Sequence, residues 1–276
     1  MMQIRRTVFR LAWPGVFTWL VLSGFTAHAD VVMVAVASNF LAPLKSLAQE
    51  FKRSSGHQLR VSAGSTGKLY AQIVNGAPYD VFLAANAAEP ARLEQAGAAV
   101  PGSRFTYARG RVVLWSADPQ RIRGNGAALL ASGGLHRIAI ANPRTAPYGA
   151  AAMAVLENLG VRARVAPLLV QGEDIGQAFH YAASGNADAG FIAYAQLRDP
   201  ANPIAGSAWV IPQALYPPIR QQAVLLTRAR DKPAARAFLA FLRGPQAASV
   251  MQQYGYGLES GAAPAAGSPP LSGPAR

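Results

Sequence analysis

The sequence contains no cysteine. Without thiols it cannot form disulfides, use a cysteine nucleophile, build a zinc ribbon or an iron–sulfur cluster, or carry a lipid on cysteine. Charged residues are also scarce, at 14% of 276 residues, whereas 51% are hydrophobic. This balance excludes a chain that is disordered throughout, and it allows one large domain or two smaller lobes.

Acidic residues are the rarer charge, with 13 Asp and Glu against 26 Lys and Arg, for a net charge of +13. A basic balance suits nucleic acid, a membrane surface or small anions. The cations are mostly scattered arginines, however, without the basic runs and interleaved aromatic residues of a nucleic-acid groove. We therefore predict no nucleic-acid partner and keep the small anion as a candidate.

Groups of catalytic residues are missing as well. The sequence has no Gly-x-Ser-x-Gly elbow, and His57, His136 and His180 lie far apart along the chain. This pattern disfavours a serine hydrolase and a metal site. Residues 64–68 read Gly-Ser-Thr-Gly-Lys, but a phosphate loop needs a wider glycine spacing and Ser or Thr where Leu69 stands. The sequence predicts no catalytic residue, no metal and no cofactor.

The N-terminus has the pattern of a cleavable signal peptide. Arg5, Arg6 and Arg10 precede an apolar stretch, and Ala27-His28-Ala29 supplies the small-x-small pattern of a cleavage site. A membrane anchor is the alternative, but Pro14 and Gly15 leave the run short of the ~20 apolar residues that a span needs. We predict residues 1–29 to be a signal peptide, with export to the periplasm, and the Pro/Ala/Gly-rich tail at 260–276 to be disordered.

Strand and helix patterns alternate between these ends. Residues 31–37 form an unbroken apolar run typical of a buried strand, and helical spacing follows from Leu41 to Phe51, with Ser38 or Asn39 as the predicted N-cap. The unit repeats, with further strands predicted at 58–63, 80–85, 111–115, 137–141, 165–170, 188–193 and 222–227, and helices at 68–74, 89–96, 149–159, 175–183 and 233–242.

Alternation of this kind predicts an α/β fold with parallel strands. The units are too many for one small lobe and too irregular for an eight-fold barrel. We predict two lobes, residues 30–109 with 212–259 and residues 110–211, each a mainly parallel sheet flanked by helices, with a ligand cleft between them.

Four strand-to-helix turns carry small polar groups where an α/β sheet binds ligands. Each predicted helix start offers free backbone N–H groups and a partial positive charge, which suit an anion. Ordinary roles compete: the serines and Asn39 as caps, Tyr148 as a packing residue, and Glu173 and Asp174 as first-turn acids. The four turns lie at 38–39, 65–67, 147–149 and 172–175.

Seven short stretches, in order, resemble the periplasmic molybdate-binding proteins of ABC importers from about residue 31 to residue 256. They lie at 34–40, 64–73, 76–85, 142–151, 172–174, 189–193 and 244–248.

The resemblance implies a type II periplasmic binding fold that closes on molybdate or tungstate. It implies a monomer that passes the anion to a membrane permease with its ATPase. The family's contacts fall on Ser38, Asn39, Ser65 or Thr66, Tyr148 and Ile175. Many members also place a tyrosine hydroxyl near residue 193. Here that position is Ala193, and we expect Tyr194 to face away because successive strand residues alternate.

Three rival functions remain. Sulfate or phosphate could replace molybdate as the ligand. An exported α/β enzyme is disfavoured because the four turns lack a catalytic group. The effector-binding half of a transcription regulator is disfavoured by the signal peptide and by the missing helix-turn-helix.

Overall fold

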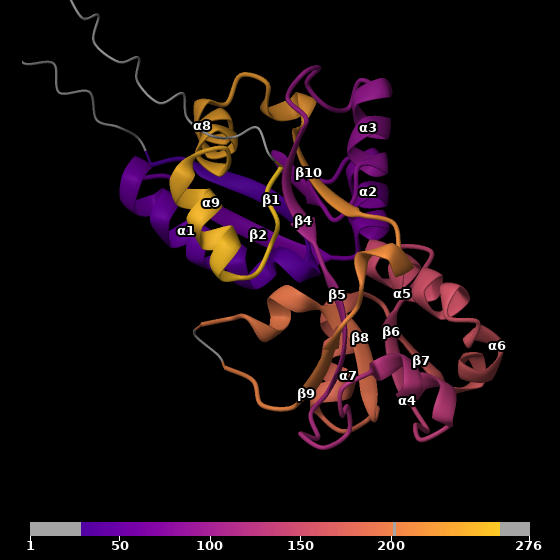
Figure 1. Ribbon diagram of the computed structural model, residues 1–276. Helices are drawn as coiled ribbons and strands as arrows, with labels where there is room; N and C mark the ends of the chain where they lie inside the picture. The colour runs from indigo at the N-terminus through magenta and orange to yellow at the C-terminus, as the bar shows by residue number, and fades with distance from the viewer. Residues whose placement is uncertain (1–28, 201–202, 260–276) are drawn as a thin grey trace, which may run out of the picture.

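The structure, a computed structural model, describes residues 29–200 and 203–259, and it folds into two five-stranded sheets with helices around each (Figure 1). The predicted signal peptide, up to residue 28, and the predicted disordered tail fall on residues outside these ranges. Within them, no helix is long and apolar enough to cross a membrane.

The first sheet has the strand order β2-β1-β3-β10-β4. Strands β1, β2 and β3 run parallel, and β10 lies antiparallel between β3 and β4. The strands span Val31–Ala37 (β1), Gln58–Gly64 (β2), Val81–Ala84 (β3), Phe105–Gly110 (β4) and Ile219–Leu225 (β10).

Both faces of this sheet are covered, which explains why β1 is apolar without alternation. Val34 and Val36 pack in a cluster with α1, α8 and α9, whereas Ala35 packs on the other face with α2 and α3. The helices span Leu41–Ser55 (α1), Thr66–Val74 (α2), Ala88–Gln95 (α3), Pro233–Leu242 (α8) and Pro245–Gln253 (α9).

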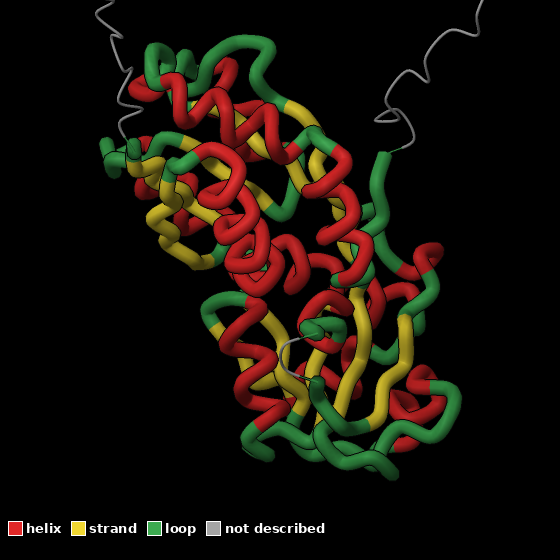
Figure 2. The backbone as a smooth tube through the Cα atoms, turned by 90° about the vertical axis from the view of Figure 1, so that its left-hand side faces the viewer, coloured by secondary structure: helices red, strands yellow, loops and turns green. Residues whose placement is uncertain are grey.

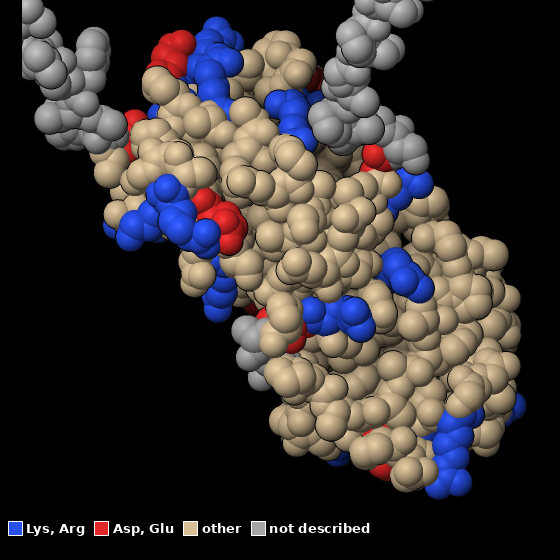
Figure 3. All heavy atoms as spheres, turned by 60° about the vertical axis from the view of Figure 1, so that its left-hand side comes forward, with Lys and Arg blue, Asp and Glu red and all other residues tan. Residues whose placement is uncertain are grey.

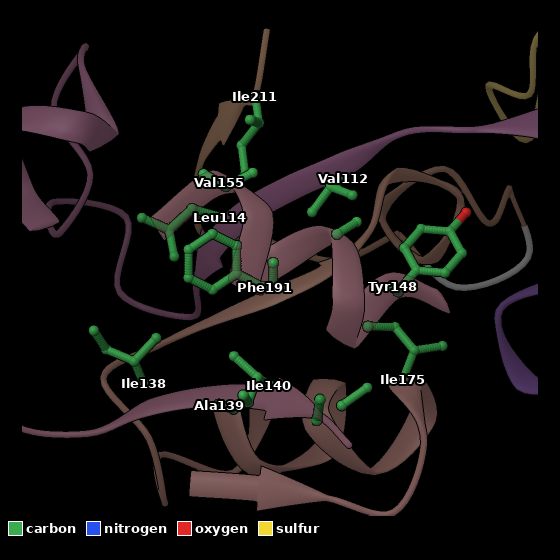
Figure 4. Packing of buried hydrophobic residues seen from close by; sticks show 14 of the residues in the cluster. Val112, Leu114, Ile138, Ala139, Ile140, Tyr148, Val155, Ile175, Phe191 and Ile211 are labelled. Atoms are coloured by element: carbon green, nitrogen blue, oxygen red, sulfur yellow. The ribbon is translucent and has the colours of Figure 1, made fainter. Parts of the chain in front are cut away.

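The second sheet has the order β7-β6-β8-β5-β9, with β6 parallel to β7 and β8, and β5 antiparallel to β8 and β9. Leu114 and Phe191 pack with Val155 of α5, and Tyr148 and Ile175 lie together at one end of this cluster (Figure 4). The elements span Val112–Ser116 (β5), Gly126–Ser132 (α4), Ile138–Ala141 (β6), Pro147–Asn158 (α5), Arg162–Val165 (α6), Leu169–Gly172 (β7), Ile175–Ala183 (α7), Ala189–Ala193 (β8) and Ser207–Val210 (β9).

The two sheets share one arrangement, in which four strands run one way and one runs against them. The reversed strands, β10 and β5, are those that join the sheets: the chain passes from β4 into β5 at Arg111 and returns from β9 to β10. Figure 2 shows the resulting two halves, one above the other. The α/β prediction is confirmed, but each sheet is mixed because of the reversed strand.

Long apolar elements were predicted best. The bounds of β1, α7 and α8 agree with those predicted. A strand predicted at 165–170 is wrong in its first half, where α6 and a 3-10 helix at Ala166–Leu168 precede β7. The short elements β4, β9, α4 and α9 were not predicted, because their polar or small residues show no periodicity over so few positions.

Candidate anion-binding site

One small pocket lies where the turns of the two halves meet, and about 180 Å³ of space within it is free of atoms, part of it open to solvent. It is much smaller than the pockets that hold drug-sized ligands, so it suits a ligand of few atoms. All six residues predicted from the sequence line it. The lining is Ala37, Ser38, Asn39, Gly64, Ser65, Thr66, Ala85, Ala146, Pro147, Tyr148, Asp174 and Ile175.

Ser38 and Ser65 present buried hydroxyls to this pocket. Neither Oγ atom has a hydrogen-bond partner among the described residues. A buried hydroxyl left without a partner costs about 1–3 kcal/mol, so two at one pocket indicate that something else binds them.

Helix capping is the alternative role that the sequence suggests for these serines, and the structure does not support it. Ala37, not Ser38 or Asn39, is the N-cap of the 3-10 helix Ser38–Phe40, and Phe40 is the N-cap of α1. Ser65 does occupy the N-cap position of α2, but its side chain makes no capping hydrogen bond.

Thr66 has a different role from Ser65. Its Oγ1 accepts a hydrogen bond from the backbone N–H of Ala85 at 3.0 Å, which ties the start of α2 to the end of β3. The sequence alone did not show which of these two neighbouring hydroxyls is available to a ligand. In the structure, Thr66 Oγ1 has a partner within the protein and Ser65 Oγ has none among the described residues.

Asn39 lies in the pocket wall with its side chain turned into the protein. Its Nδ2 donates to Gln221 Oε1 at 2.8 Å and to Tyr256 Oη at 3.0 Å, and Tyr256 Oη donates to the Asn39 carbonyl at 2.8 Å. Both amide hydrogens thus have partners within the protein, so the Asn39 side chain does not donate into the pocket.

The second half contributes the starts of two helices. Tyr148 is the second residue of α5, and Ile175 is the first residue of α7. Within the described part of the chain, neither backbone N–H donates a hydrogen bond. Each helix start also carries a partial positive charge, so both N–H groups suit an anion.

Local contacts hold these helix starts in place. Asp174 is the N-cap of α7, and its Oδ1 accepts from the N–H of Gly176 at 2.8 Å and of Gln177 at 3.1 Å. Glycine at 149 lets α5 approach β6, because a Cβ there would lie 2.2 Å from the Ala141 carbonyl oxygen.

The halves also touch each other beside the pocket. The N–H of Gly67 donates to the Thr145 carbonyl at 2.8 Å, and Lys68 forms an ion pair with Glu173. Glu173 and Asp174 therefore do not act alike: the first pairs across the cleft and the second caps α7. The hydrogen bond to Glu173 raises the pKa of Lys68.

No Lys, Arg or His is among the residues that line the pocket, and the charged residue there is Asp174, whose Oδ1 is taken up by capping α7. On the face shown in Figure 3, the basic side chains lie in separate small groups. Burial raises the pKa of the Tyr148 hydroxyl well above its ordinary value, so it stays protonated. Over the described ranges, no group of three or more His, Asp or Glu is arranged to hold a metal ion.

Two residues near the pocket, Tyr194 and Gln221, are not part of its lining. Tyr194 does not line the pocket: it opens a short 3-10 helix, and Arg111 lies 4.8 Å from its ring centroid. Gln221 lies behind the pocket, fully buried, and the sequence reasoning missed it. Adjacent glutamines in an apolar strand were the available signal, because a buried amide needs partners.

The chain is similar to known proteins over most of its length. Residues 32–257 match the family model described as bacterial extracellular solute-binding protein. The chain is 49% identical over 233 residues to molybdate-binding protein ModA of Azotobacter vinelandii, covering 84% of this chain and 92% of the relative. Its identity to molybdate-binding protein ModA of Rhodobacter capsulatus is 46% over 230 residues, covering 83% and 89%.

A solved structure is similar in fold as well. The Azotobacter vinelandii periplasmic molybdate-binding protein superposes with a TM-score of 0.80 at 44% identity, and the match covers 83% of this chain and 100% of that chain.

Proposed function

We propose, since this chain belongs to the family of bacterial extracellular solute-binding proteins, that it is the molybdate-binding component of an ABC importer. The names and identities of the two molybdate-binding relatives support molybdate as the ligand and a binding protein rather than an enzyme. We extend the proposal to tungstate and to delivery to a permease with its ATPase, with the protein acting as a periplasmic monomer released by cleavage after Ala29.

The observation that carries the proposal is the pair of buried serine hydroxyls without partners, Ser38 and Ser65, in a pocket that two helix starts also face. We assign these two side chains, with the backbone N–H groups of Asn39, Thr66, Tyr148 and Ile175, as the donors to the anion. Hydroxyls and N–H groups can offer a hydrogen to every oxygen of a fully ionised oxyanion.

The donor set also accounts for binding without a cationic side chain. Several neutral donors, preorganised within each lobe, and the ends of helix dipoles compensate a buried anion. A small pocket further limits the ligand to an ion of a few atoms.

The placement of the assigned donors supports binding by closure of two lobes. Ser38, Asn39, Ser65 and Thr66 belong to the proposed lobe of residues 30–109 with 212–259, and Tyr148 and Ile175 to that of residues 110–211. An anion that contacts both sets stabilises the closed form, because only there do all donors reach it. We assign the hinges to the crossover segments 107–110 and 211–218.

Thermal unfolding of residues 30–276 tests the proposal, with molybdate, tungstate, sulfate, phosphate or no anion at equal concentration. Ligand at about 100 times its dissociation constant adds about 2.7 kcal/mol of stability, or several degrees. We expect molybdate and tungstate to raise the melting temperature. A shift with sulfate or phosphate alone would leave the assignment as a binding protein intact and identify a different ligand. No shift with any anion would refute the proposal.

A further inference from the structure

We propose that Gln221 is a positioning residue that holds the two sets of anion donors in register across the crossover between the lobes. The inference rests on the proposed function and deepens it, by naming a residue outside the pocket that sets the affinity of the closed form.

Gln221 makes hydrogen bonds toward both lobes. Its Oε1 accepts from Asn39 Nδ2 at 2.8 Å and from Tyr107 Oη at 3.1 Å, and its Nε2 donates to Tyr148 Oη at 3.3 Å. Asn39 and Tyr148 both line the pocket, whereas Gln221 does not. One buried amide therefore connects the donors at the end of β1 with those at the start of α5.

The position of this amide is set by the strands that join the sheets. The register of β10 against β4 shifts at this point: Gln221 pairs with Ala108 and Gln222 with Thr106, so Tyr107 has no partner across the ladder. An extra residue of this kind forms a bulge, which redirects nearby side chains. The bulge lies within a few residues of the crossover at Arg111.

The Gln221–Tyr148 pair also packs on the crossover itself. A Cβ at Gly110, the last residue of β4, would lie 2.1 Å from Tyr148 Oη and 2.9 Å from Gln221 Nε2. In Figure 4 the Tyr148 hydroxyl points away from the other labelled residues of the cluster. The tyrosine thus offers its backbone N–H to the pocket and anchors its ring end at the crossover.

This arrangement predicts a specific effect on binding. The bond from Gln221 fixes where the start of α5 stands relative to Ser38 and Ser65, and preorganised donors bind more tightly than mobile ones. Hydrogen bonds in a buried network also support one another, so the loss of the central amide loosens Asn39 and Tyr148, its two partners that line the pocket.

Gln222 supplies a matched control. It is the next residue of β10 and is nearly buried, at 9% exposure. Its Oε1 accepts from Arg104 at 2.9 Å, and its Nε2 donates to Thr106 at 3.2 Å. Neither partner lines the pocket, so Q222L removes two comparable hydrogen bonds from the same strand without touching the anion donors.

The experiment compares Q221L, Y148F, the double variant Q221L/Y148F and Q222L with the wild type. Molybdate dissociation constants are measured by calorimetry, and melting temperatures are measured without anion. We expect Q221L to weaken binding about tenfold and Y148F at least about threefold, with the double variant no weaker than Q221L alone. Q222L should lower the melting temperature and keep wild-type affinity within about twofold.

The outcomes separate the two proposals. If the wild type does not bind molybdate, the proposed function fails. If the wild type binds and Q221L binds equally well, or if Q221L and Q222L weaken binding to the same extent, Gln221 has only a structural role and the inference is overturned. Additive losses in the double variant would overturn it too. If Q221L does not fold, Y148F decides, because wild-type affinity in that variant contradicts the proposed link.

Discussion

The two sides of the pocket present hydrogen-bond donors of different kinds. The side built from the first sheet has two side-chain hydroxyls without a partner, Ser38 and Ser65, beside the backbone N–H groups that we assign as donors, whereas the side built from the second sheet has only backbone N–H groups, at the starts of α5 and α7. A side-chain donor can be deleted by one substitution. A backbone donor can be removed only by a proline or by moving the chain that carries it.

The difference extends to how each donor is held. Ser38 follows β1, most of whose apolar residues are buried, and Ser65 follows β2, the edge strand that pairs with β1, so the positions of both serines depend on the sheet. The N–H of Ile175 depends on a cap, because Asp174 occupies the next two N–H groups of the first turn and leaves the first one free. Sheet packing fixes one side of the pocket, and helix capping fixes part of the other.

The largest effect is expected from the side-chain donors. S38A and S65A each remove a donor to a buried anion, and we predict a loss in molybdate affinity of about 10–100-fold for each, measured by calorimetry. T66V is the matched control: it leaves the Ala85 N–H unpaired and should lower the stability by about 1–3 kcal/mol with a smaller change in affinity. If S65A bound molybdate as tightly as the wild type, the assignment of Ser65 would be wrong.

A smaller effect is expected when the backbone side is displaced. G149A places a methyl group against the Ala141 carbonyl, so α5 must shift at its first turn. We predict a destabilisation of about 1–3 kcal/mol and a loss of affinity of about tenfold. A150S, on the exposed side of the same turn, is the control and should change neither. Wild-type affinity in a destabilised G149A would show that the start of α5 does not contact the anion.

The ion pair that joins the two sides should matter less. Lys68 and Glu173 are 52% and 56% exposed, and ion pairs so open to solvent are weak and screened by salt. K68M should weaken molybdate binding by no more than about threefold, and the difference should disappear at high salt. A loss as large as that of S65A would instead make Lys68 part of the site.

No effect is expected from pH near neutrality. Burial raises the pKa of Tyr107 and Tyr148 well above the usual value of about 10, so both hydroxyls stay neutral in the folded protein. Molybdate affinity should therefore be constant between about pH 6.5 and pH 9. Above about pH 10, unfolded tyrosines ionise and folded ones do not, so the melting temperature should fall. A tenfold change in affinity within the neutral range would contradict a site of neutral donors.

Much of the fold was predictable, because buried strands and amphipathic helices leave a periodic pattern. The run before Ser38 and the helices at 175–183 and 233–242 are examples. The direction of the reversed strands was harder to predict. The pattern of residues 219–225 does not indicate the direction of β10, which depends on where the chain returns to the first sheet.

The candidate site was predictable as a set of turns. Polar residues after strands come together at the carboxyl edges of sheets, and all six predicted residues do line one pocket. The role of each was not predictable, since Ser38, Ser65 and Thr66 are equally good caps by type.

The sequence by itself determined the class of the protein: an α/β chain without thiols, with four polar helix starts and little catalytic chemistry. Only the tertiary structure decided which hydroxyls stay without a partner, that the Asn39 side chain turns inward, and that Gln221 joins the two sides. The reason is physical. Pattern along the chain records burial and local backbone preference, whereas the partner of a polar atom depends on segments as distant as Asn39 and Gln221, which meet only after folding.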